Sequence, residues 1–157
     1  MQRVLKTVDA VNKVVGYVLA VMMGLMAALV ILQVLNRSLL HLPLHWLEEL
    51  TRYLMIYVIF MGASLAVRYR RMIAIETMPQ SLRPKWRKFL VIGVLLLSIA
   101  FYAIMVWLGI QILERVQLQV SAGMGISMSW PYAAIPIGGC LLILNALATL
   151  LEEWTSD

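Results

Sequence analysis

Long runs of apolar residues alternate with short polar segments along this chain. Residues 14–35 contain 22 consecutive positions without a charged side chain. As a helix this run would extend about 33 Å, which is long enough to cross a bilayer. Residues 89–112 and 128–151 form two further apolar runs. We predict a transmembrane helix for each of the three.

A fourth span is expected between the first two runs, although its charge-free part, residues 53–67, has only 15 residues. That length is marginal for crossing a bilayer. Extending the helix back to Trp46 adds Glu48, Glu49 and Arg52 at the level where aromatic and polar residues mark a membrane boundary. We therefore predict one helix over residues 46–67 with polar first turns.

Two prolines lie in the last span. Pro131 suits an early helical position, whereas Pro136 is expected to kink the helix.

The first span has a competing interpretation as a signal peptide, because Arg3, Lys6 and Lys13 precede it. Its apolar run is too long for that, and no small-x-small cleavage site follows it. We therefore expect the first span to be a membrane anchor.

The overall composition agrees with a lipid environment. Of the 157 residues, 62% are hydrophobic and 13% are charged, against about a quarter charged in soluble domains. The net charge of +5 could suggest nucleic acid, but the basic residues lie between apolar runs. The predicted fold class is an all-α integral membrane protein of four transmembrane helices, forming a single domain over residues 1–157.

The distribution of lysine and arginine predicts the orientation. The N-terminal tail has three, the central loop over residues 68–88 has seven, and the opposite side has Arg37 and Arg115, with Arg52 near that side. Cytoplasmic segments carry the excess of such residues. The prediction is N-in/C-in, with both ends and the central loop in the cytoplasm.

The motifs of common catalytic sites are absent from the sequence. There is no GxSxG, no Walker loop and no HExxH. The single cysteine, Cys140, can form no internal disulfide. His41 and His45 have metal-ligand spacing, but they flank Pro43 and are interpreted as interfacial. The sequence therefore predicts no catalytic, substrate-binding or metal site in this chain.

The span centres lack the ionisable residues that transporters place around a substrate. The few inner polar groups are uncharged: Gln33, Ser64, Ser98, Gln111 and Asn145. Small residues recur every fourth position, a spacing that lets helices approach closely, although such residues are also common in membrane helices. The predicted packing residues are Gly16, Ala20, Gly24, Ala28, Gly62, Ala66, Ala134 and Gly138.

The polar start of the second span is a candidate contact surface. Arg52 has helical spacing to both Glu48 and Glu49, so we expect ion pairs that leave one carboxylate for a partner or for water. The alternative is an interfacial ion pair that merely ends the span.

Four short patterns give the chain a family resemblance. They are a basic N terminus before a span ending in Asn36-Arg37, Trp46-x-Glu48-Glu49-x-x-Arg52-Tyr53, a basic segment over residues 70–79, and Gly125 to Gly138 with Trp130, Tyr132 and Pro136. In their order and spacing they resemble the small membrane subunit of tripartite ATP-independent periplasmic (TRAP) transporters, the DctQ-like family. The chain departs from the family pattern at Met72 to Glu76 and at Ser127.

The resemblance implies a small, non-catalytic scaffold subunit, not an enzyme, in a bacterial or archaeal inner membrane. Its expected partners are a large DctM-like permease subunit and a periplasmic DctP-like binding protein, with organic acid as the solute. Sodium is expected to bind to the large subunit. This chain is expected to bind no cofactor and no nucleic acid. The implied docking residues are Trp46, Glu48, Glu49, Arg52 and Tyr53.

Other possibilities remain. A cluster of basic residues (Arg83, Lys85, Arg87 and Lys88) is predicted to lie among anionic phospholipid heads, although positive-inside retention explains it equally well. A stand-alone homo-oligomeric transporter and a membrane enzyme or redox subunit are the competing functions. The first would need a buried ionisable residue at the bilayer centre.

Overall fold

The computed structural model describes residues 2–40, 44–69 and 84–155. Most of these residues are helical. The elements are α1 (Gln2–Leu35), a short π-helical continuation η1 (Asn36–Leu40), α2 (His45–Arg68), α4 (Pro84–Val116), α5 (Ser129–Tyr132) and α6 (Ala134–Thr155). Four helical segments, which begin at Leu5, His45, Lys88 and Ser129, are long and apolar enough to cross a membrane. The four predicted spans are confirmed.

The helices extend beyond the apolar runs that predicted them. α1 begins at Gln2 and α4 continues to Val116, because polar residues at a membrane boundary can continue a helix that apolar residues start. The polar turns of the second span belong to α2, which starts at His45.

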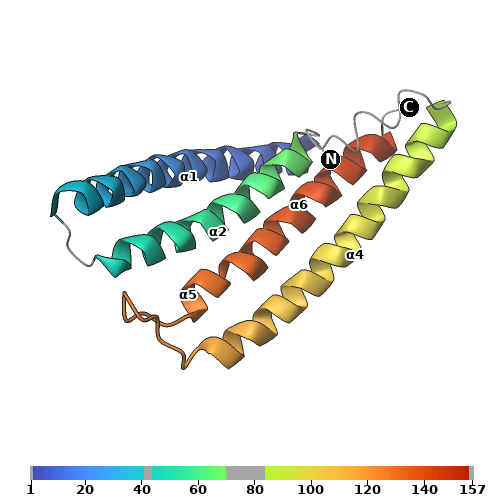
Figure 1. Ribbon diagram of the computed structural model, residues 1–157. Helices are drawn as coiled ribbons and strands as arrows, with labels where there is room; N and C mark the ends of the chain where they lie inside the picture. The colour runs from blue at the N-terminus through green and yellow to red at the C-terminus, as the bar shows by residue number, and fades with distance from the viewer. Residues whose placement is uncertain (1, 41–43, 70–83, 156–157) are drawn as a thin grey trace.

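The four long helices lie side by side in the order α1, α2, α6, α4 (Figure 1). The neighbours in this row pack on one another, and α1 reaches α6 only slightly. Both termini lie at one end, which we call the termini end, and residues 117–128 lie at the other, the loop end. The result is an open layer, which is possible because lipid does not penalise exposed apolar surface as water does.

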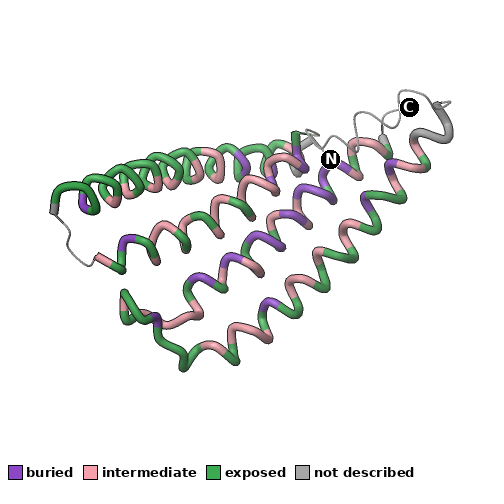
Figure 2. The backbone as a smooth tube through the Cα atoms, in the orientation of Figure 1, coloured by how far each residue is buried: buried purple, intermediate pink, exposed green. Residues whose placement is uncertain are grey.

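Burial is concentrated in the middle of the layer. In Figure 2 the buried positions follow α6, while the outward parts of α1 and α4 are exposed. On α6, Ala134, Leu142 and Ala146 are almost inaccessible. A β-carbon on Gly138 would overlap the Phe60 side chain of α2, and one on Gly139 would overlap Val106 of α4. Glycines on both sides of α6 therefore allow close approach to both neighbours.

The last span is interrupted about one turn before Pro136, where the ring of a proline disturbs the helix. The chain breaks at Ala133, between α5 and α6, and Pro136 lies in the first turn of α6. A proline there removes an N–H that would have no partner within α6 in any case, so the first turn of α6 accommodates Pro136.

Candidate functional site

The most elaborate polar arrangement at the loop end surrounds Glu49. Its carboxylate accepts hydrogen bonds from the Ser121 hydroxyl, from the Gly123 N–H at 2.9 Å and from the Met124 N–H at 3.0 Å. A β-carbon on Gly123 would lie 3.0 Å from the Glu49 carboxyl carbon. The glycine thus lets the loop close around the carboxylate, and Glu49 ties α2 to residues 121–124.

The loop held by Glu49 is a small hairpin. Val120 and Ser127 form an isolated antiparallel bridge. The backbone N–H of Ser121 donates to the Ile126 carbonyl at 2.8 Å. Gly125 at its turn has a φ of 67°, a left-handed conformation that glycine adopts without steric cost. The backbone of this loop is therefore ordered by its own hydrogen bonds as well as by Glu49.

Two tyrosines of α2 continue this attachment. The Tyr57 hydroxyl donates to the Trp130 carbonyl at 2.7 Å, and the Tyr53 hydroxyl lies 3.7 Å from the Met128 sulfur. Residues three or four apart on a helix share a face, so Glu49, Tyr53 and Tyr57 form one line along α2. This line fixes the start of α5.

The predicted docking residues consequently divide into two groups. Glu49 and Tyr53 hold the loop, whereas Glu48, Arg52 and Trp46 are exposed, with Trp46 retaining 41% of its surface. In the described part of the chain no salt bridge joins Arg52 to Glu48 or Glu49, so the expected close ion pairs do not form, although Arg52 still attracts the Glu49 carboxylate from a longer distance. The Glu49 carboxylate instead accepts hydrogen bonds from the loop. These donors are held in place by the loop backbone, whereas the long Arg52 side chain would lose conformational freedom on pairing.

A second polar cluster, at the termini end, joins three helices. The side-chain amides of Asn12 and Asn145 donate to each other at 2.6 and 2.9 Å, and Asn145 also donates to the Ser64 carbonyl. Both asparagines are almost fully buried. Buried amides need such partners, so this cluster aligns α1, α2 and α6. The sequence singled out Asn145 but not Asn12, whose position before the first apolar run resembles an ordinary surface residue.

Arg68 strengthens the same end. Its guanidinium pairs with Asp9 of α1 at 2.8 Å and with Glu152 of α6 at 2.7 Å, while its own side chain is 8% exposed. From the sequence, Arg68 was expected to belong to the basic central loop over residues 68–88. It is the last residue of α2, and its two acidic partners are distant in sequence, so no local pattern could have revealed the cluster.

The predicted packing residues lie in different environments. Gly62 faces Leu19 at 3.6 Å and Gly16 faces Leu65 at 3.9 Å, both measured from an added β-carbon. Ala20, Gly24 and Ala28 are exposed, and nothing lies within 4 Å of a β-carbon on Gly24. Most of the stripe on α1 therefore faces away from this chain. Ala66 is half-buried, and Ala134 and Gly138 are buried in α6.

Of the four residues in the predicted lipid-headgroup cluster, the structure describes the side chain of Lys88 alone. Arg83 lies outside the described residues, as do the side chains of Lys85 and Arg87, and Lys88 is half-buried at the start of the third candidate span. His41 is likewise outside the described residues, so the histidine pair stays a prediction.

The span centres offer little chemistry. Within the described ranges, no group of three or more His, Cys, Asp or Glu residues could hold a metal ion. Residues 14–35, 53–67, 89–112 and 129–151, which form the central parts of the four described spans, contain no Asp, Glu, Lys or Arg. The charged groups thus lie toward the two ends of the helices.

Comparison with known proteins agrees with this architecture. Residues 26–156 match the family described as tripartite ATP-independent periplasmic transporters, DctQ component. The chain is 26% identical over 142 residues to the sialic acid TRAP transporter small permease protein SiaQ of Vibrio cholerae, covering 90% of this chain and 82% of that protein. It is also 32% identical over 117 residues to the sialic acid TRAP transporter permease protein SiaT of Haemophilus influenzae. That match covers 74% of this chain but only 19% of SiaT.

Proposed function

The chain belongs to the DctQ component family of TRAP transporters, and from this premise we propose that it is the non-catalytic scaffold subunit of a sodium-coupled transporter for organic acids. As a member of this family it is a multi-pass protein of the inner membrane and a component of a transport system. The proposal adds a division of labour: a large permease subunit carries the solute and sodium, while this chain widens its stationary part.

The observation that carries the proposal is the open layer of helices with charge only at its ends. A travelling anion or a sodium ion needs polar ligands within the bilayer, and the described span centres provide no charged ones. Apolar side chains such as Val21, Ile31, Leu97 and Phe101 remain more than 60% exposed. A layer with two such faces has ample surface for a large membrane partner.

The match to SiaT supports the need for a partner polypeptide. A segment similar to this chain makes up about a fifth of that permease, whereas SiaQ is named as a separate small permease protein. We infer that this chain works beside a polypeptide corresponding to the rest of SiaT. Sialic acid, named in both relatives, is the first organic acid to test.

Reconstitution into proteoliposomes tests the scaffold role. We expect sodium-driven, binding-protein-dependent uptake when this chain and the large subunit are present together, and none from this chain without the large subunit. Co-purification of the two subunits provides the control for assembly. Sodium-driven uptake by this chain in the absence of the large subunit would overturn the proposal.

We further propose that the loop end contacts the large subunit or the docked binding protein. The exposed group of Trp46, Glu48 and Arg52 would make the direct contact, and Glu49 and Tyr53 would hold the hairpin beside it. Arg52→Glu should lower uptake at limiting binding protein while membrane insertion is unchanged. Thr7→Glu, at an exposed site at the termini end, is the matched control. Unchanged uptake in Arg52→Glu would contradict the docking role.

A further inference from the structure

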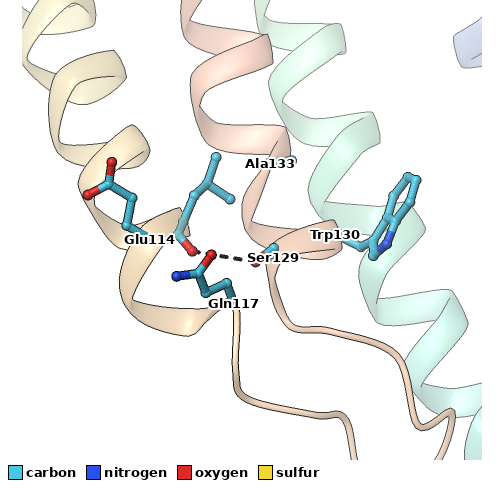
Figure 3. A pocket seen from close by; sticks show the side chains of 6 residues that line it. Glu114, Gln117, Ser129, Trp130 and Ala133 are labelled. Atoms are coloured by element: carbon cyan, nitrogen blue, oxygen red, sulfur yellow. Dashed lines mark hydrogen bonds between the residues drawn. The ribbon is translucent and has the colours of Figure 1, made fainter.

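Two hollows follow one another along the seam between α4 and α6. The one nearer the loop end has a volume of about 400 Å³ and is lined by Leu113, Glu114, Gln117, Ser129, Trp130 and Ala133. Figure 3 shows Glu114 on α4, Gln117 just after the end of α4, and Ser129 and Trp130 on α5. The second, of about 430 Å³, continues toward the middle of the helices.

The residues of the two hollows occupy the same helix faces. On α4, Val106 and Ile110 line the second hollow and Glu114 the first, at successive steps of four residues. Ala133, just before α6, lines the first hollow, and Ile137 and Leu141 of α6 line the second with the same spacing. Because such positions share a helix face, the two hollows follow each other along the same side of the two helices. We call them together the α4–α6 groove.

The length of the α4–α6 groove matches one leaflet of a membrane. The stretch from Val106 to Gln117 rises about 17 Å along a helix, and half of a hydrocarbon core is about 15 Å. Its polar end lies at the end of a candidate span, which closes at Val116. The other end lies near the middle of that span.

The groove is also amphipathic. Its inner part is lined by Val, Ile, Leu and Pro side chains and by Cys140. Its loop end has the Glu114 carboxylate, the Gln117 amide and the indole of Trp130, which is 70% exposed. Within the described residues no ion pair or hydrogen bond engages the Glu114 side chain. The Ser129 hydroxyl is already directed to the Leu113 carbonyl at 3.4 Å (Figure 3).

From this geometry we infer that the α4–α6 groove binds a phospholipid with a primary ammonium headgroup, such as phosphatidylethanolamine. The ammonium donates to the Glu114 carboxylate, and the Gln117 amide donates to a phosphate or ester oxygen. One acyl chain lies along Val106, Ile110 and Ile137. An anionic headgroup would place its negative charge beside that of the Glu114 carboxylate. A quaternary ammonium has no N–H group to donate a hydrogen bond to this carboxylate. This inference requires only that the chain spans a membrane.

Native mass spectrometry of the full chain with equal amounts of phosphatidylethanolamine, phosphatidylglycerol and phosphatidylcholine tests the headgroup. We expect phosphatidylethanolamine to be retained about fivefold over phosphatidylglycerol, the factor for a contact of roughly 1 kcal/mol. Glu114→Gln should abolish the preference. Glu48→Gln, which removes an exposed carboxylate of α2 outside the groove, should preserve it. Equal retention of the three lipids by the unmodified chain, or an unchanged preference in Glu114→Gln, would overturn the inference.

Cys140 reports on the position of the lipid. It is the single cysteine of the chain, it is exposed and it lines the inner part of the groove. Labelling by a membrane-soluble maleimide should slow severalfold when phosphatidylethanolamine is added to the detergent-purified chain, and less in Glu114→Gln. If the large subunit without added lipid protects Cys140 and phosphatidylethanolamine does not, the groove is a subunit contact and the inference is wrong.

Discussion

Neighbouring residues with the same chemistry have separate roles in this protein. Glu48 and Glu49 are adjacent, yet only Glu49 receives the Ser121 hydroxyl and the backbone N–H groups of Gly123 and Met124. Successive residues on a helix point about 100° apart. One carboxylate therefore faces the hairpin and the other faces its surroundings, a distinction that depends on where residues 121–124 lie.

Glu49→Gln should loosen the hairpin without unfolding the chain. The amide keeps the shape of the side chain but removes the negative charge that strengthens hydrogen bonds from N–H donors. We expect amide hydrogen exchange at Gly123 and Met124 to become severalfold faster. Glu48→Gln is the matched control and should leave exchange unchanged. Equal exchange in the two variants would show that Glu49 does not hold the loop.

At the scale of elements, α6 organises the layer because it packs on both α2 and α4. Its glycines allow this contact on two sides, Gly138 against Phe60 and Gly139 against Val106. α1 packs mainly on α2, and side-chain hydrogen bonds near its two ends add to this contact. Asn12 meets Asn145 at the termini end, and Gln33 donates to the Leu47 carbonyl and the Thr51 hydroxyl at 2.9 Å near the loop end.

Glycines with the same helical context should therefore respond differently to substitution. Gly138→Ala should destabilise the isolated chain by about 1–3 kcal/mol, the usual cost of overpacking. Gly24→Ala meets open space and should be neutral or stabilising by up to about 1 kcal/mol, the difference in helix propensity. Unfolding of the detergent-purified chain in SDS provides the measurement. A loss of stability in Gly24→Ala as large as in Gly138→Ala would contradict the packing described for α6.

At the scale of the whole molecule, the layer has two distinct ends. The termini end holds the Asn12–Asn145 and Arg68 clusters, and the loop end holds the hairpin and Glu49. Both chain ends lie together (Figure 1), as an even number of spans requires. Which end faces the cytoplasm is an inference from lysine and arginine placement, and it stays a prediction.

Cysteine labelling in intact cells tests that orientation. In a Cys140→Ala background, Ala122→Cys in the hairpin should react with a membrane-impermeant maleimide from outside, because the loop end is predicted to face the periplasm. Thr7→Cys at the termini end should react only after the membrane is permeabilised. Both sites are exposed, so a difference in reactivity reports on sidedness. The reverse pattern would show that the predicted orientation is inverted.

Local information explains how much of this architecture could be predicted. The length and continuity of the apolar runs are enough to locate four spans, since a bilayer imposes one thickness on all of them. The family followed from short patterns such as the one over residues 46–53. The helix ends and the break at Ala133 were less accessible, because a proline such as Pro136 is compatible with either a kink or a first turn.

The sequence was sufficient to establish a helical membrane protein, its spans and its family, because solvation by lipid depends on side-chain polarity along a single segment. The folded arrangement was needed to show the open layer, the partners of Asn12 and Arg68, the hairpin around Glu49 and the α4–α6 groove. Each of these joins residues far apart in the chain. Their meeting depends on which helices become neighbours, and most apolar faces in lipid can pack against one another.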